Sequence, residues 1–200
     1  GNKGLGAGWD YQWNDRTRHK LNIGLSSYTS NLFAVDTLKD LRYNDFDRQF
    51  RQDNNRLSDL SIHYETEISA HNGSYFVGGN FNKILIERGG EGLEKIVADT
   101  TSASISTLFL ERKYLNEKWN ATVGLRLNHF SKTNELYPEW RMLASYKTSE
   151  KFLFKGSVTR SYQFIHRVRE QSLYLNQPDT WLLSDESRLP VLSCDQIVLG

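Results

Sequence analysis

The sequence predicts an all-β protein, an antiparallel, up-and-down transmembrane β-barrel of which this chain holds about nine strands. Three observations lead to this prediction. Long runs of residues alternate between apolar and polar, aromatic residues stand near the ends of these runs, and the links between runs differ regularly in length. Successive side chains of a strand point to opposite faces, so each run gives the sheet one apolar and one polar face.

The alternation is well developed in the second half of the chain. Residues 119–128 place five apolar side chains on one face, and residues 140–147 and 152–161 repeat the pattern. A half-buried sheet of a soluble protein also alternates. These runs have about ten residues, however, whereas soluble strands usually have about five or six and a tilted strand needs about nine to eleven to cross a bilayer.

Aromatic residues near the run ends favour the membrane interpretation. Amphipathic rings lie at the headgroup level of membrane barrels. The residues concerned are Trp119, Trp140, Tyr146 and Phe152.

The chain before residue 119 supplies five further runs. Residues 4–13 and 20–26 alternate, and residues 60–71 show the clearest alternation of all. Asn72-Gly73 then provides two residues that tolerate positive φ in a tight hairpin turn before the run 75–82. Residues 103–115 are the least regular run, and a ninth strand is expected to begin near Val191.

The links between the runs alternate in length. Short links lie around Asp15, Asn72, Glu117 and Ser149, and the longer links cover residues 30–57, 88–102, 131–137 and 164–190. Outer-membrane barrels combine tight periplasmic turns with extended external loops. We therefore expect the short links to be periplasmic and the longer ones external.

Nine strands are not expected to close by themselves. An open sheet edge in lipid leaves backbone groups unsatisfied, so further strands must complete the barrel. The polar face is rich in small residues, which predicts a wide lumen holding water or a plug. Residues 1–200 are thus expected to be part of one β-barrel domain. The sequence shows no initiator Met and no charged-then-apolar signal segment at Gly1, so we expect a piece of a longer exported protein whose signal peptide lies outside this chain.

Composition narrows the classes of protein. The mean hydropathy of −0.60 fits a barrel, which dilutes apolar residues with polar ones. A net charge of +1 gives no long-range argument for nucleic acid, which we do not expect as a partner. The single cysteine, Cys194, cannot form an internal disulfide, and no Cys/His spacing typical of a zinc site occurs.

Several motifs of the second half resemble those of a known family. Residues 111–130 (ERKYLNEKWNATVGLRLNHF) look like a late-barrel hairpin of TonB-dependent outer-membrane receptors. Residues 137–147 are similar to their "P-R-x-x-x-x-Y" strand, although Trp140 interrupts the Pro-Arg pairing, and residues 154–167 match their "S-x-x-R-x-x-Q-x-x-H" pattern. Residues 178–181 (PDTW) and 195–200 resemble the continuation in receptors of the Bacteroidota type, including SusC-like and carboxypeptidase-regulatory-like members.

This resemblance implies a barrel of about 22 strands that is closed by a plug. It also implies import of a scarce ligand (a siderophore, vitamin, oligosaccharide or peptide) across the bacterial outer membrane, with energy from the TonB complex. The lipid bilayer and the TonB complex would be partners, and a SusD-like surface lipoprotein a further one. The plug and the coupling segment would lie outside this chain.

No catalytic residue, metal site or cofactor is predicted. His63, Glu65 and Glu67 share one face, but neighbouring polar residues of a lumen are usually a hydrated wall. The residues expected nearest the ligand open the last external link: Tyr162, Gln163, His166 and Arg169. Two alternatives remain, a soluble β-rich binding module and an outer-membrane barrel enzyme, the second of which would need a Ser/His or paired-acid group at one rim.

Overall fold

The computed structural model describes the backbone of residues 1–40, 45–92, 95–168, 171–172, 175–176 and 180–200. Side chains are described for residues 1–31, 54–89, 99–167 and 181–200. The strands are β1 (Asn2–Asn14), β2 (Thr17–Asp40), β3 (Asp45–Ala70), β4 (Gly73–Gly92), β5 (Lys95–Leu115), β6 (Trp119–Phe130), β7 (Glu135–Lys147), β8 (Leu153–Gln163), β9 (Ile165–Val168), β10 (Gln171–Ser172), β11 (Leu175–Asn176), β12 (Thr180–Leu183) and β13 (Leu192–Leu199).

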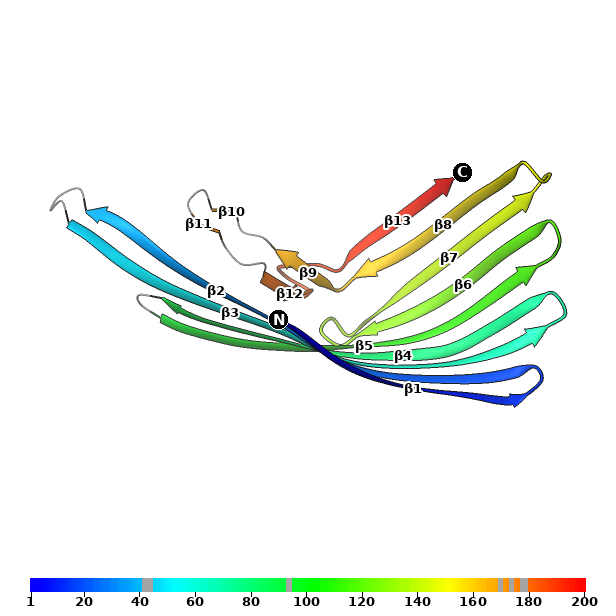
Figure 1. Ribbon diagram of the computed structural model, residues 1–200, viewed down its shortest axis with the longest axis horizontal. Helices are drawn as coiled ribbons and strands as arrows, with labels where there is room; N and C mark the ends of the chain where they lie inside the picture. Colours follow the sequence, from blue (N-terminus) through cyan, green and yellow to red (C-terminus); the bar gives the residue numbers. More distant parts are fainter. Residues whose placement is uncertain (41–44, 93–94, 169–170, 173–174, 177–179) are drawn as a thin grey trace.

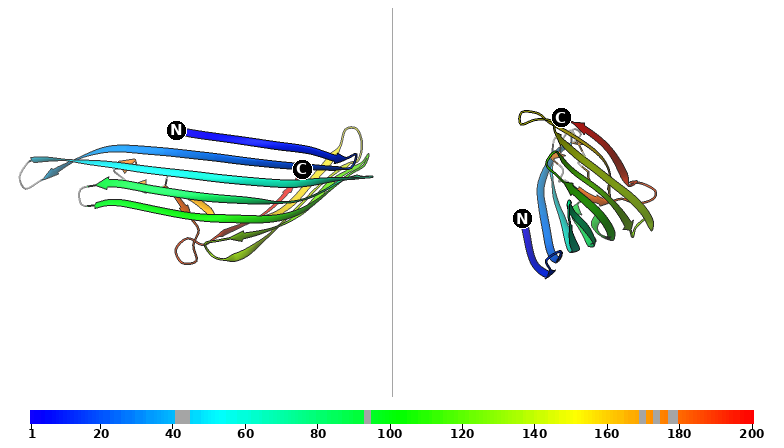
Figure 2. Two further views of the ribbon diagram at one scale, coloured as in Figure 1. Left: turned by 90° about the horizontal axis from the view of Figure 1, so that it is seen from below. Right: turned by 90° about the vertical axis from the view of Figure 1, so that its right-hand side faces the viewer.

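Nine of these strands form one sheet in the order β1 to β8 followed by β13, and each is antiparallel to its neighbours (Figure 1). The sheet is bent into an arc with β1 at one side and β13 at the other (Figure 2). Within the described residues these two edge strands do not pair with each other. The predicted all-β, antiparallel, up-and-down fold is confirmed, and the sheet is open. No helix in the described ranges is long and apolar enough to cross a membrane.

All four short links lie at one end of the sheet, as predicted (Figure 1). The turn between β3 and β4 depends on Gly73, which has a φ of 114°. A Cβ at this position would collide with the carbonyl oxygen of Lys113. Glycine is therefore required here both by the backbone conformation and by the close approach of β5.

The links predicted at residues 30–57 and 88–102 are wrong in extent, because residues 30–40, 45–57, 88–92 and 95–102 are strand. The β2–β3 ladder continues out to the pair Asp40 and Asp45, and the β4–β5 ladder out to Gly92 and Lys95. An antiparallel ladder satisfies the backbone groups of both strands whatever side chains they carry, so a hairpin can continue where the apolar alternation stops. The predicted link 131–137 is shorter than expected, since β7 already begins at Glu135.

The two faces of the sheet differ in chemistry. We call the face that carries the apolar stripes the outer face and the opposite one the inner face. The outer face leaves large apolar side chains exposed, for example Leu5 at 76%, Leu108 at 71% and Ile197 at 71%. In the part of the chain that the structure describes, no second sheet or helix layer covers the stripes at residues 60–70 and 119–127.

The inner face is covered at one end by the chain that follows β8. Phe164 and Leu183 of this segment are buried against Ile84, Ile86 and Phe130 of the sheet. This small core lies on the same face as the polar stripe. We call residues 164–191 the inserted segment.

Candidate functional site

The inserted segment is anchored to the sheet by aromatic and aliphatic packing. Its strands β9 and β12 form a short antiparallel ribbon. Phe164, which precedes β9, lies with its ring centroid 5.0 Å from that of Phe130, and Phe130 has no exposed surface. Because this contact joins the end of β8 to the end of β6, it holds the segment against the inner face.

A polar contact fixes the ribbon internally. His166 Nε2 and Ser184 Oγ lie 2.8 Å apart, and both residues are buried. The Ser184 N–H also donates to the Phe164 carbonyl oxygen at 2.9 Å. Buried polar groups are costly unless they are paired, so this pairing allows β9 and β12 to lie within an apolar cluster.

A tight turn follows the ribbon and is built on one carboxylate. Asp185 Oδ1 accepts hydrogen bonds from the backbone N–H groups of Ser187, Arg188 and Leu189 at 2.9, 2.6 and 3.1 Å. These N–H donors, above all those of Arg188 and Leu189, lower the pKa of Asp185 to about 2, because they stabilise the charged form.

A cavity of about 380 Å³ lies between the inserted segment and the sheet. Arg88 of β4 donates to Asp99 of β5 at 2.6 Å on its wall. Within the described residues, the side chains of Lys132 and Arg188 have no anionic partner there. The lining residues are Ile86, Arg88, Asp99, Thr101, Lys132, Trp181, Leu182, Leu183, Asp185, Arg188 and Leu189. The arrangement can take a small anionic group beside an indole ring.

The four residues predicted nearest the ligand are placed as follows. His166 is buried inside the ribbon, and Tyr162 packs edge-on against Tyr137, with ring centroids 5.2 Å apart. Gln163 Nε2 donates to the carbonyl oxygen of Ile165 at 2.8 Å. Arg169 lies outside the described residues. The three described residues thus support the inserted segment, and their contact with a ligand stays a prediction.

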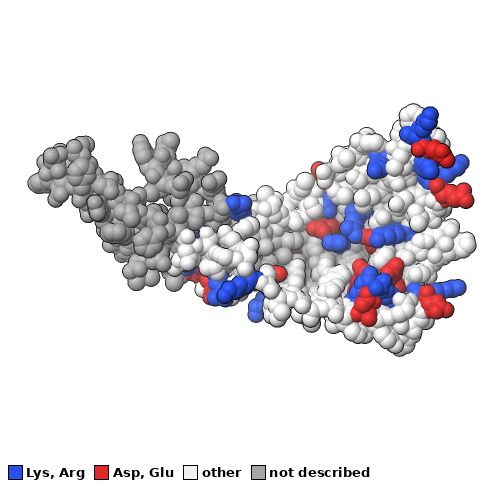
Figure 3. Space-filling view, in the orientation of Figure 1, with Lys and Arg blue, Asp and Glu red and all other residues white. Residues whose placement is uncertain are grey.

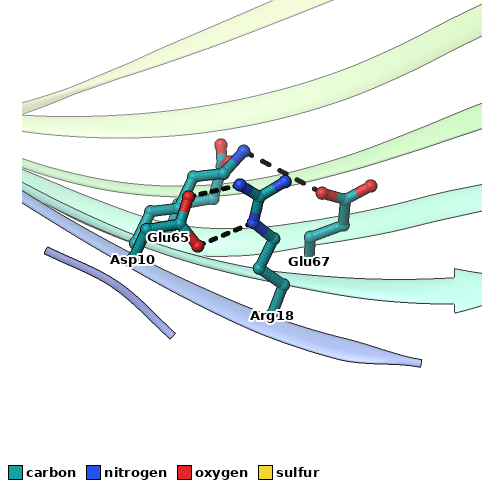
Figure 4. A network of polar contacts seen from close by, with 5 residues as sticks. Asp10, Arg18, Glu65 and Glu67 are labelled. Carbon is teal, nitrogen blue, oxygen red and sulfur yellow. Dashed lines mark hydrogen bonds and ion pairs between the residues drawn. The ribbon is translucent and has the colours of Figure 1, made fainter. Parts of the chain in front are cut away.

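Charged side chains of both signs lie on the inner face toward the short turns (Figure 3). Figure 4 shows Arg18 Nε donating to Asp10 Oδ1, at 2.7 Å, with Glu65 and Glu67 on the neighbouring strand. Lys20 Nζ lies 3.7 Å from Glu65 and 3.9 Å from Glu67. These carboxylates face cations of the adjacent strand.

His63 does not join these carboxylates. Its ring bonds to Asn80 Oδ1 and stacks on Phe109, with centroids 5.8 Å apart and planes inclined by 4°. Among the described residues no group of three His, Cys, Asp or Glu side chains is arranged to hold a metal ion. The interpretation of His63, Glu65 and Glu67 as a hydrated wall stays a prediction.

A further ion pair on the inner face joins β5 and β7. Arg141 of β7 donates to Glu111 of β5 across the intervening strand β6, where Gly124 leaves room for both side chains. The Glu111 side chain is only 8% exposed. Arg126 and Glu139 lie close by and line a cavity of about 200 Å³ together with Arg141.

Comparison with known proteins agrees with this architecture. The siderophore receptor PirA from Pseudomonas aeruginosa has a solved structure that matches 99% of this chain and 41% of the receptor, with a TM-score of 0.50 and 17% identity. The match shows a shared fold. The chain thus spans well under half the length of that barrel receptor. No protein-family model and no curated protein sequence matches the chain.

Sequence reasoning missed the cavity under the inserted segment. Arg88 and Asp99 fall in a region predicted to be a link, and Arg188 belongs to another link with no alternation. One sequence feature could have indicated that this link packs against the sheet. Residues 181–183 are Trp-Leu-Leu, and a fully solvated loop does not need such apolar side chains. Their partners come from distant strands and were not identifiable by spacing.

Proposed function

We propose that the chain is a wall and external-loop segment of a TonB-dependent outer-membrane transporter that imports a scarce ligand. The observation that carries this proposal is a single sheet with an exposed apolar outer face, a charged inner face and a segment folded onto the inner face at the external end. A fold shared with part of a siderophore receptor supports it.

The outer face argues for lipid as its solvent. Contiguous exposed apolar surface marks a membrane or protein interface. On β4, the nine residues from Tyr75 to Lys83 begin with an aromatic ring and end with a cation. This length lies within the range of about nine to eleven residues that a tilted strand needs to cross a bilayer.

The inner face argues for an aqueous lumen. Its ion pairs Asp10–Arg18 and Glu111–Arg141 would be costly against hydrocarbon, whereas water or a polar plug solvates them. The inserted segment narrows this lumen near its external end. A narrowed entrance fits selective import better than passage through an open pore.

The cavity under the inserted segment is the proposed ligand-facing surface. Its cations Lys132 and Arg188 favour a ligand with an anionic group, and Trp181 offers an aromatic face. Siderophores, vitamins, oligosaccharides and peptides remain the candidate classes. The sequence resemblance further supports a receptor of the Bacteroidota, SusC-like type. Such a receptor would have a plug and about 22 strands in its barrel, and TonB and a SusD-like lipoprotein as partners. The plug and the remaining strands would lie outside this chain.

Cell fractionation and uptake measurements test the proposal. We expect the protein in the outer-membrane fraction, resistant to alkaline carbonate and soluble only with detergent. Ligand uptake should stop when the TonB complex is deleted. A cooperatively folded monomer in detergent-free buffer would instead support a soluble β-rich module and overturn the proposal.

A further inference from the structure

A groove crosses the outer face over strands β3 to β7. It has a volume of about 380 Å³ and is lined mainly by apolar side chains. Tyr64, Leu108, Leu127 and Leu136 form its sides, and Gly79 lies between them. The groove is separate from the cavity under the inserted segment, which opens on the inner face.

The groove exists because Gly79 has no side chain. Its register partners on the same face are Tyr64 of β3 and Leu108 of β5, which are both large and exposed. A Cβ at Gly79 would lie 3.0 Å from the carbonyl oxygen of Thr107, so the adjacent strand approaches closely at this point. The floor of the groove at Gly79 is therefore backbone, and the side chains of Tyr64 and Leu108 rise on either side of it.

The groove becomes polar toward its external end. Ser106 and His129 line it there, and His129 Nε2 lies 3.1 Å from Asn134 Oδ1. Lys83 lies two residues beyond Phe81 on the same face of β4 and is exposed. An apolar channel thus leads to a cationic edge.

Lys83 differs from the other outer-face cations of strands β3 to β7. Arg112 lies 4.1 Å from the ring centroid of Tyr75, and Arg56 is 3.6 Å from Glu87. Within the described residues of these strands, Lys83 has no ion pair and no aromatic partner. Its charge is available to a ligand.

We propose that this groove binds an anionic phospholipid, with one acyl chain lying over Gly79 and the phosphate beside Lys83 and His129. The inference rests on the proposed membrane function and goes beyond it, since transport does not require a lipid site. A lysine ammonium binds phosphate as a point charge, and the apolar groove accepts hydrocarbon. A peptide strand could not add here, because both backbone edges of the central strands are already paired.

Native mass spectrometry of the protein in mild detergent tests the proposal. The probes are phosphatidylglycerol and phosphatidylcholine with identical acyl chains. Wild-type protein should retain phosphatidylglycerol preferentially, and Lys83→Gln should reduce that retention about fivefold, the effect of one lysine at a lipid surface. Lys3→Gln is the matched control, because Lys3 is an exposed outer-face cation on the distant strand β1.

A second pair of variants tests the groove itself. Leu127→Trp should fill it and reduce retention of both lipids, whereas Leu125→Trp, on the same face of β6 but outside the groove, should not. Equal retention in wild type, Lys83→Gln and Leu127→Trp would overturn the proposal, as would competition by inorganic phosphate alone. Failure of the proposed function would look different, because a water-soluble protein would retain no lipid in any variant.

Discussion

Phe164 packs against Phe130 with its ring centroid 5.0 Å away, and this pair joins the chain after β8 to the end of β6. Phe130 is fully buried although it lies on the face where the sequence pattern places polar residues. The contact therefore explains why an apolar residue is found on the inner face. It also holds the inserted segment against the inner face.

Removing this aromatic anchor should release the inserted segment. Phe130→Ala is expected to cost about 3–5 kcal/mol, the usual loss for a fully buried phenylalanine. Limited proteolysis of intact cells should then cut within residues 165–183. Leu127→Ala, on the outer face of the same strand, is the control and should leave the segment protected. Equal protection in both variants would contradict the role of Phe130.

The orientation of β6 can be tested by placing arginine on each face. Leu125→Arg should destabilise the folded protein in bilayers by about 2–4 kcal/mol, because the charge would enter hydrocarbon. Thr122→Arg should cost far less, since Thr122 borders an inner-face cavity of about 460 Å³. Unfolding by denaturant in lipid vesicles measures both changes. Similar losses would refute the assignment of the faces.

The choice of inner-face position matters in this experiment. Asn128 also belongs to the polar stripe of β6, so the sequence pattern alone predicts that an arginine at this position would cost little stability. Asn128 is buried, however, and its Oδ1 accepts a hydrogen bond from Thr107 Oγ1 at 2.7 Å. Asn128→Arg should therefore destabilise the protein more than Thr122→Arg.

The ion pair between Glu111 and Arg141 should be strongly coupled. Arg141→Met leaves a buried carboxylate without its cation and should cost about 1–3 kcal/mol. The double variant Glu111→Gln/Arg141→Met should recover much of this loss, because no unpaired charge remains. A double-mutant cycle measured by denaturant unfolding checks the coupling. Additive losses would show that the two side chains act independently.

The turn at Asp185 should open only in strong acid. Its pKa is lowered from 3.8 to about 2, so its contribution to stability is fully present above about pH 4 and is lost as the pH falls toward 2. Pepsin, which is active in this range, should begin to cleave within residues 185–189 only below about pH 3. Asp185→Asn removes the titrating charge. Its cleavage, normalised to the activity of pepsin at each pH, should not change between pH 4 and pH 2, and a parallel change in the normalised cleavage of both proteins would contradict the assignment.

Much of the fold could be predicted because the signals are local. The alternation of residues 60–71 and 119–128 predicts that these segments are strands, how long they are and which side chains share a face. It does so because the side chains of a strand alternate whatever lies around them. The Asn72-Gly73 turn is equally local. The lengths of β2 and β3 were underestimated, because their outer parts are held by backbone pairing, which leaves no pattern in the side chains.

The site was less predictable. The sequence predicts Tyr162, Gln163 and His166 to lie near the ligand because they stand at the end of a strand. In the structure these three residues make contacts that support the inserted segment. Arg88 and Asp99 are register partners on β4 and β5, and Arg188 reaches them only because the chain after β8 folds back. The spacing of residues along the sequence does not show that the inserted segment folds back onto the inner face.

The sequence alone determined that alternate side chains of long strands form an apolar and a polar stripe, because a period of two is a property of the extended backbone. It also determined at which end the tight turns lie. Only the tertiary structure decided that residues 164–191 fold onto the inner face. That outcome depends on apolar side chains such as Ile86, Phe130 and Leu183, which are far apart along the chain and become a core only when the sheet brings them together.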